Sequence, residues 1–254
     1  MGPAIGRRLA AEVVGTSILV GIGASAGAAS GGSFGVVPVA FAHGLGLMVA
    51  IYAFGPTSGG HFNPTVTLAL VARRRFPPAE MAPYILAQLL GGVIGAAVVL
   101  AVLGDAGVDV GLGATTLAED IGPLQGMVAE AVGTFVLLTA VMALAVDVRA
   151  PAGFFGLGIG LGLAGIIMAF GPVSGASLNL ARTLGPNVML SLAGGDAAWG
   201  DFFVYLIGPL VGGLLAVIVH DVIAQAPTVA DTDVVELQGP DRDVAGGAPV
   251  ERRP

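Results

Sequence analysis

Two stretches of the chain decide its fold: Gly55-Pro56-Thr57-Ser58-Gly59-Gly60-His61-Phe62-Asn63-Pro64-Thr65 and Gly171-Pro172-Val173-Ser174-Gly175-Ala176-Ser177-Leu178-Asn179-Leu180-Ala181. Each leads through a glycine turn to an asparagine that suits a helix N-cap, and Pro64 suits the first helical position. The apolar segments there, about 63–72 and 179–190, are too short to cross a bilayer, because a spanning helix needs about 20 mostly apolar residues. We therefore expect two half-helices, whose connecting loops are buried in protein or line a cavity.

The two stretches belong to a repeat that runs through most of the chain. Residues 11–16 (Ala-Glu-Val-Val-Gly-Thr) recur at 129–134 (Ala-Glu-Ala-Val-Gly-Thr), an offset of 118, and the two stretches above are offset by 116. A glycine-rich segment at 90–95 recurs at 207–212, an offset of 117. A near-constant offset indicates a duplicated unit of three spans. Because three spans reverse the direction of the chain, we expect the second copy to be inverted, with the half-helices meeting near the bilayer midplane.

The composition around this repeat is that of a membrane protein. The 254 residues are 55% hydrophobic and only 11% charged, which leaves too few charges to coat a soluble domain. Six apolar stretches are long enough to span a bilayer, and they lie at about 7–27, 35–57, 82–103, 125–147, 152–171 and 201–225. The first is interpreted as a retained helix and not as a cleaved signal peptide. The expected fold is an all-α membrane protein with six transmembrane helices plus two re-entrant half-helices in an inverted three-helix repeat.

The chain divides into a membrane domain and a tail. The membrane domain is expected at residues 1–225, with repeats at about 7–103 and 125–225. Residues 226–254 carry several aspartates and glutamates among proline and glycine. This composition is typical of a disordered acidic C-terminal tail.

The charged residues orient the chain and exclude several functions. All ten basic residues are arginine, and those at 7–8, 73–75 and 149 precede span one, follow span two and separate spans four and five. These positions share one side of a six-span chain, so the positive-inside rule predicts that both termini are cytoplasmic, in a plasma (inner) membrane. No basic patch is large enough for nucleic acid. The absence of cysteine excludes disulfides, thiolate metal sites and a cysteine nucleophile.

The two asparagines predict a polar midpoint for the membrane domain. If the capped N-termini face each other, each carboxamide oxygen caps its own helix and leaves its NH2 group free to donate to a passing molecule. The paired positive dipole ends would orient water and repel cations, protons included.

These features together resemble the aquaporin (major intrinsic protein) family. The resemblance rests on Arg182, on the paired Glu12 and Glu130, and on the half-helix residues. The half-helix residues are Asn63, Pro64, Thr65, Asn179, Leu180 and Ala181. The resemblance covers about residues 7–225 and implies, for residues 1–225, an aquaporin-like channel domain that assembles as a homotetramer. The chain departs from the family's usual Asn-Pro-Ala at Thr65 and Leu180, and these changes bear on the diameter of the midpoint and on proton exclusion.

The resemblance also implies a selectivity filter of four residues, located by counting from the asparagines: His43, Ile167, Ala176 and Arg182. This set resembles the filter of plant vacuolar-membrane aquaporins, which pass water and often ammonia or urea. These residues do not identify a single substrate. Glycerol channels of the family follow the filter arginine with aspartate, whereas this chain has Thr183. The implied partners are the lipid bilayer, water and small neutral solutes, with ammonia first and urea and glycerol as further candidates.

Several of these residues have alternative roles. Glu12 and Glu130 could relay protons, although their single occurrence in each repeat favours hydrogen bonding to the loops that feed the half-helices. His43 could be a core histidine, although its register with Arg182 favours the filter. His61 could line a pore or brace its loop.

The predicted function is a passive membrane channel for water and small neutral solutes, with no catalysis, no metal and no cofactor. One alternative is an inverted-repeat secondary transporter, which the lack of an unpaired acidic residue beside the half-helices argues against. The other is an occluded structural membrane protein, in which Thr65 and Leu180 narrow the midpoint.

Overall fold

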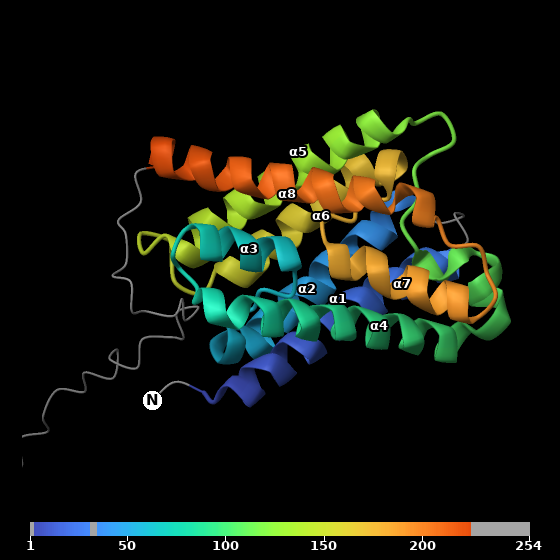
Figure 1. Cartoon of the computed structure of the whole chain (residues 1–254), viewed down its shortest axis with the longest axis horizontal. Coiled ribbons are helices and arrows are strands. Elements are labelled where there is room, and N and C mark those ends of the chain that lie inside the picture. Colours follow the sequence, from blue (N-terminus) through green and yellow to red (C-terminus); the bar gives the residue numbers. More distant parts are fainter. Residues whose placement is uncertain (1–2, 31–34, 225–254) are drawn as a thin grey trace, which may run out of the picture.

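The computed structural model describes residues 3–30 and 35–224, which form a bundle of helices (Figure 1). In chain order these are α1 (Ile5–Ser30), α2 (Val36–Ser58), α3 (Pro64–Ala72), α4 (Pro78–Asp109), η1 (Gly111–Gly113), α5 (Pro123–Val141), η2 (Met142–Val146), α6 (Phe155–Ser174), α7 (Leu180–Leu192), η3 (Trp199–Asp201), α8 (Phe202–Val219) and η4 (His220–Ala224). The predicted tail at 226–254 lies outside the described residues.

Six helices in the described part of the chain are long and apolar enough to cross a membrane, which confirms the predicted spans. They are Ile5–Ser30, Val36–Ser58, Pro78–Asp109, Pro123–Val146, Phe155–Ser174 and Trp199–Ala224. The third span was predicted to end at about 103, but α4 continues to Asp109 through a kink at Gly104, where φ is 57°. Glycine adopts this positive φ without the steric cost that other residues carry. The all-α fold with two short half-helices, α3 and α7, is therefore as expected.

The two halves of the chain pack in the same way. In the first half α1 contacts α2 and α4, and in the second half α5 contacts α6 and α8. Figure 1 shows the half-helices α3 and α7 approaching the centre of the bundle from opposite directions. The start of α1 and the end of α8 lie at the same end of the bundle (Figure 1).

Glycines allow the long helices to approach at backbone distance. A Cβ atom added to Gly212 on α8 would collide with the carbonyl oxygen of Ala131 on α5, and one added to Gly91 on α4 would collide with that of Val13 on α1. Lipid offers no hydrophobic driving force for helix association, so close packing of small residues is a main source of stability. The equivalent helix pairs, α1 with α4 and α5 with α8, therefore use this packing in both halves.

Candidate functional site

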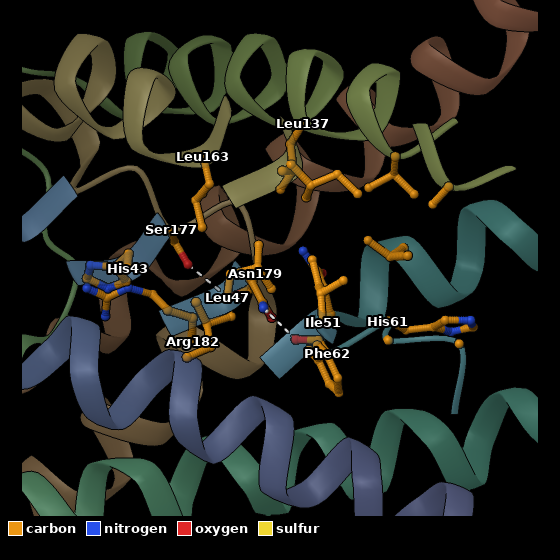
Figure 2. A pocket seen from close by; sticks show the side chains of 18 of the residues that line it. His43, Leu47, Ile51, His61, Phe62, Leu137, Leu163, Ser177, Asn179 and Arg182 are labelled. Carbon is orange, nitrogen blue, oxygen red and sulfur yellow. Dashed lines mark hydrogen bonds between the residues drawn. The ribbon is translucent and has the colours of Figure 1, made fainter. Parts of the chain in front are cut away.

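A cavity lies between the two halves of the bundle, along α1, α2, α5, α6 and the half-helices. The four residues predicted for the filter all line this cavity: His43, Ile167, Ala176 and Arg182. The end where His43 and Arg182 lie close together is here called the Arg182 end (Figure 2). The opposite end, here called the Val146 end, is lined by Leu70, Ala145 and Val146. Figure 2 shows His43 and Arg182 close together, His61 far from them and Asn179 in between.

The two asparagines cap their half-helices at the centre of the cavity. The Asn63 side chain accepts a hydrogen bond from the Thr65 backbone N–H (2.9 Å), and the Asn179 side chain accepts one from the Ala181 N–H (3.0 Å). Both asparagines have extended backbone conformations, as N-cap residues do. Because both asparagines line the cavity, the two positive helix ends converge at its midpoint.

The amide groups of these asparagines are not wholly free, which corrects the expectation from the sequence. Asn63 Nδ2 donates to the carbonyl oxygen of Leu178 (2.9 Å), and Asn179 Nδ2 donates to that of Phe62 (2.8 Å; Figure 2). Phe62 and Leu178 have positive φ angles of 48° and 56°, an uncommon conformation for residues other than glycine. Each half-helix cap therefore uses one amide hydrogen to bind the loop of the other half, and one remains for the cavity.

Glu12 lies behind the first loop, outside the cavity lining, and accepts four hydrogen bonds. Its Oε1 accepts from Ser58 Oγ (2.7 Å) and the His61 N–H (3.0 Å). Its Oε2 accepts from the Phe62 N–H (2.7 Å) and Gln88 Nε2 (2.8 Å). The side chain is completely buried, so these donors replace the water that a carboxylate would otherwise need.

Glu130 has the same position behind the second loop. Its Oε1 accepts from Ser174 Oγ (2.7 Å) and the Ser177 N–H (2.9 Å), and its Oε2 accepts from the Leu178 N–H (2.7 Å). It is also completely buried and outside the cavity lining. Neither carboxylate contacts the route that a solute would follow.

His43 and Arg182 present complementary polar groups at the Arg182 end. His43 Nδ1 lies 2.9 Å from the carbonyl oxygen of Val39, which can only accept, so the ring proton is on Nδ1 and the neutral ring leaves Nε2 as an acceptor. Nε2 has no hydrogen-bond partner among the described residues. Arg182 Nη1 donates to the carbonyl oxygen of Gly113 (2.8 Å). The other guanidinium N–H groups add donors at this end.

His61 lines the cavity and also takes part in bracing its loop. Its Nδ1 lies 3.0 Å from Thr67 Oγ1, and its ring contacts those of Phe76 and Tyr84 at centroid distances of 4.7 and 5.2 Å. Its backbone N–H is one of the donors to Glu12. The structure thus places His61 in both of the positions that the sequence left as alternatives.

Thr65 and Leu180 do not line the cavity, which argues against the expectation that they set its diameter. The Thr65 methyl group faces Gly213 on α8, where an added Cβ would be only 2.6 Å away. Along with Leu70, α3 turns toward the cavity Val66, which sequence reasoning missed. It lies three residues after Asn63, as Arg182 lies three residues after Asn179, so the repeat itself could have identified it.

Charged residues near the ends of α3, η2 and the last span form contacts with one another. Arg149 hydrogen-bonds to the Asp147 carboxylate and holds the pKa of that carboxyl at about 2, below its usual range. Arg149 also donates to the carbonyl oxygen of Ala224 (3.0 Å), and Arg73 forms an ion pair with Asp221. These contacts join the segments after α3 and η2 to the end of η4.

Comparison with known proteins gives concordant results. The family model described as "Major intrinsic protein" matches residues 3–220. The chain is 42% identical to Aquaporin AqpM of Methanothermobacter marburgensis, over 84% of this chain and 96% of that protein. It is 41% identical to Aquaporin TIP4-4 of Zea mays, over 85% of each chain. The structure of the aquaglyceroporin from Plasmodium falciparum superimposes with a TM-score of 0.79 at 24% identity, covering 87% of this chain and 97% of the other.

Proposed function

The chain belongs to the major intrinsic protein family, and from this premise we propose that it conducts ammonia as well as water through a filter at the Arg182 end. The protein is an integral multi-pass membrane protein and a passive channel for water and small neutral solutes, not an enzyme. Neither the secondary transporter nor the occluded structural protein is supported, because members of this family are channels.

The observation that supports the proposal is that His43, Ile167, Ala176 and Arg182 all line the same cavity, with His43 and Arg182 close together (Figure 2). Arg182 provides a fixed positive charge that opposes ammonium and protons, together with donors for a neutral solute. His43 Nε2 provides an acceptor for the hydrogens of ammonia or water. Ile167 offers no hydrogen bond and Ala176 adds little bulk, so the aperture is wider and less polar than one formed by four polar side chains.

The half-helices add to the exclusion of cations at the midpoint of the cavity. The facing dipole ends at Asn63 and Asn179 add a second barrier to cations at the midpoint. We assign Glu12 and Glu130 a structural role, because every contact that each makes is with a buried donor of the loop or the bundle. A proton relay would need contact with the solute path, which neither carboxylate lines.

The assembly and orientation are part of the same proposal. We assign the chain to a homotetramer in the plasma (inner) membrane, as its family resemblance implies, with residues 1–225 forming the channel domain. The arginines at 7–8, 73–75 and 149 favour cytoplasmic termini. In that orientation the Val146 end is cytoplasmic and the Arg182 end faces outward. Glycerol is a further candidate, because the chain is 36% identical to glycerol uptake facilitator protein-like 6 of Lactiplantibacillus plantarum. Urea is a further candidate from the resemblance of the four filter residues alone.

The test is a double substitution that moves the histidine from position 43 to position 167 and places a larger phenylalanine at position 43, His43→Phe with Ile167→His. Stopped-flow measurements on proteoliposomes would compare water flux with ammonia entry, the latter followed by internal alkalinisation, and empty liposomes would serve as the control. We expect ammonia permeability to fall much more than water permeability. An equal loss of both, or no ammonia flux through the parent protein, would contradict the proposal.

A further inference from the structure

Three buried hydroxyl groups form a chain beside the Arg182 end. Ser177 Oγ donates to the carbonyl oxygen of Asn179 (2.9 Å) and lies 2.6 Å from Thr183 Oγ1. Thr183 Oγ1 in turn lies 3.1 Å from Thr115 Oγ1. Each of these three side chains belongs to a residue at most 4% exposed. Ser177 lines the cavity, whereas Thr115 and Thr183 do not, so their contact is shielded from water in the cavity. These hydrogen bonds join the end of α7 that meets the cavity to the segment that follows η1.

The direction of this hydrogen-bonded chain follows from counting protons. A hydroxyl group has one hydrogen to donate and two lone pairs that accept. Ser177 donates its hydrogen to the Asn179 carbonyl, so in the contact with Thr183 it can only accept, and Thr183 donates. Thr183 has then used its hydrogen, so Thr115 donates to Thr183. Each hydroxyl group therefore donates to the next in one direction, from Thr115 in the segment after η1 to the N-cap of α7.

The segment that carries Thr115 also holds Arg182. Gly113, two residues before Thr115, supplies the carbonyl oxygen to which Arg182 Nη1 donates (2.8 Å). Gly113 has a φ of 68°, and an added Cβ would collide with the backbone of Ala24, so its position against α1 depends on glycine. Arg182 and Thr183 are neighbours in the first turn of α7. The segment is thus bound to that turn at two adjacent residues.

We propose that Thr115 and Thr183 are positioning residues for the channel's selectivity, because their hydroxyl pair holds the Gly113 carbonyl where it draws the Arg182 side chain to the cavity wall. This inference rests on the proposed filter role of Arg182. Without the hydroxyl contact, the segment loses one of its attachments to α7. A buried guanidinium that loses its acceptor pays a desolvation cost, and it regains a partner by reaching into the aperture toward water. Permeation then falls.

The other half of the molecule lacks this arrangement. Thr67 has the position in α3 that Thr183 has in α7, but its hydroxyl lies 3.0 Å from His61 Nδ1 and accepts from Gln88 Nε2 (2.9 Å). His61 belongs to the loop that leads directly into α3, and Gln88 belongs to α4. Neither partner is in a separate connection that also binds the side chain preceding Thr67. Val66 precedes Thr67 as Arg182 precedes Thr183, so there is no charged side chain for a hydroxyl to position.

The experiment is a double-mutant cycle on osmotic water permeability in proteoliposomes, normalised to the amount of folded protein. Thr115→Val removes the hydroxyl at nearly constant shape, and it should lower permeability about threefold to tenfold, as expected for one buried hydrogen bond. Thr115→Ser should restore it. In an Arg182→Ala background, Thr115→Val should change permeability by less than about twofold, because the side chain that it positions is absent.

Matched variants separate positioning from general damage. Thr139→Val removes a hydroxyl that bonds only to a carbonyl of its own helix, that of Phe135 (2.7 Å), and it should leave permeability unaltered. If Thr115→Val does not fold, Thr183→Val with its rescue by Thr183→Ser provides the same test. The inference is overturned if the valine variants have no effect, or if they reduce permeability by the same factor with and without Arg182. If Arg182→Ala alone alters neither water permeability nor the ratio of urea to water flux, the filter assignment fails instead.

Discussion

The two ends of the cavity are built from equivalent positions of the two repeats, yet their side chains differ sharply. Eight pairs of lining residues are related by offsets of 116 or 118: Leu19 and Leu137, His43 and Ile159, Leu47 and Leu163, Ile51 and Ile167, Gly60 and Ala176, His61 and Ser177, Asn63 and Asn179, and Val66 and Arg182. The asparagine pair, the two leucine pairs and the isoleucine pair are identical. Because the second copy is inverted, residues that meet at the Arg182 end have their counterparts toward the Val146 end.

This comparison separates the scaffold from the filter. The capped half-helices, the glutamates behind the loops and the cavity walls are common to both halves, so the duplicated backbone alone produces a symmetric passage. In the proposed filter, selection comes from the pairs that differ, above all Arg182 against Val66 and His43 against Ile159. The positive charge of Arg182 acts strongly in a low-dielectric site, and the apolar Val66 at the equivalent position has no charge that could offset it.

The largest expected effect comes from removing the shared support. Glu12→Ala strands four buried donors and Glu130→Ala strands three, at ~1–3 kcal/mol for each unsatisfied donor. Both variants should give little folded protein, with Glu12→Ala the less stable. Thermal unfolding in detergent and size-exclusion yield would measure this, with Glu119→Ala, an exposed carboxylate between η1 and α5, as the control. A Glu130 variant less stable than the Glu12 variant would break the comparison.

A selectivity effect should follow from making the two ends alike. Arg182→Val places the same side chain three residues after each asparagine. The ratio of urea to water permeability should rise about tenfold, as expected when a charged hydrogen-bonding group worth ~1.5 kcal/mol is lost. Val66→Ala, at the equivalent position, should change this ratio much less. Flux measurements in proteoliposomes test both, and equal changes in the two variants would show that the ends do not differ in selection.

The smallest effect is expected where a loop contacts the bundle and not the cavity. Asp147→Asn weakens the contact with Arg149, whose side chain is 55% exposed, so the loss of stability at pH 7 should be below ~1 kcal/mol. The pKa of Asp147 is lowered in the folded state to about 2, so its contribution is present above the unfolded pKa of ~3.9 and is lost as the pH falls toward 2. The difference in unfolding midpoint between parent and variant should shrink over that range. A reduced water permeability in this variant would argue that the Val146 end also selects.

The sequence allowed much of this architecture to be predicted, because the relevant signals are local or repeated. Apolar runs of sufficient length predicted the six spans, and glycine turns before Asn63 and Asn179 predicted the half-helices. The family resemblance, applied by counting from those asparagines, implied His43 and Arg182 as filter residues, and both line the cavity. The same register applied to the first copy would have identified Val66.

The contacts across the inverted repeat could not be predicted in this way. The amide group of Asn63 donates to the carbonyl oxygen of Leu178, a residue of the other half. Leu178 has a positive φ, which is uncommon for leucine and which its sequence does not indicate. Thr65 differs from the family pattern, yet its side chain faces Gly213 and not the cavity. Which face of a short helix is turned toward a cavity depends on the helices packed around it.

The sequence by itself determined the membrane class, the spans, the repeat and the capped half-helices, because chain hydropathy and neighbouring residues are sufficient to specify them. Only the tertiary structure decided where Arg182 is held, since its acceptor on Gly113 is 69 residues away in the chain. It also decided that Thr115 and Thr183 meet. Hydrogen bonds between distant segments depend on the relative placement of whole helices, and that placement is set by packing over the entire bundle.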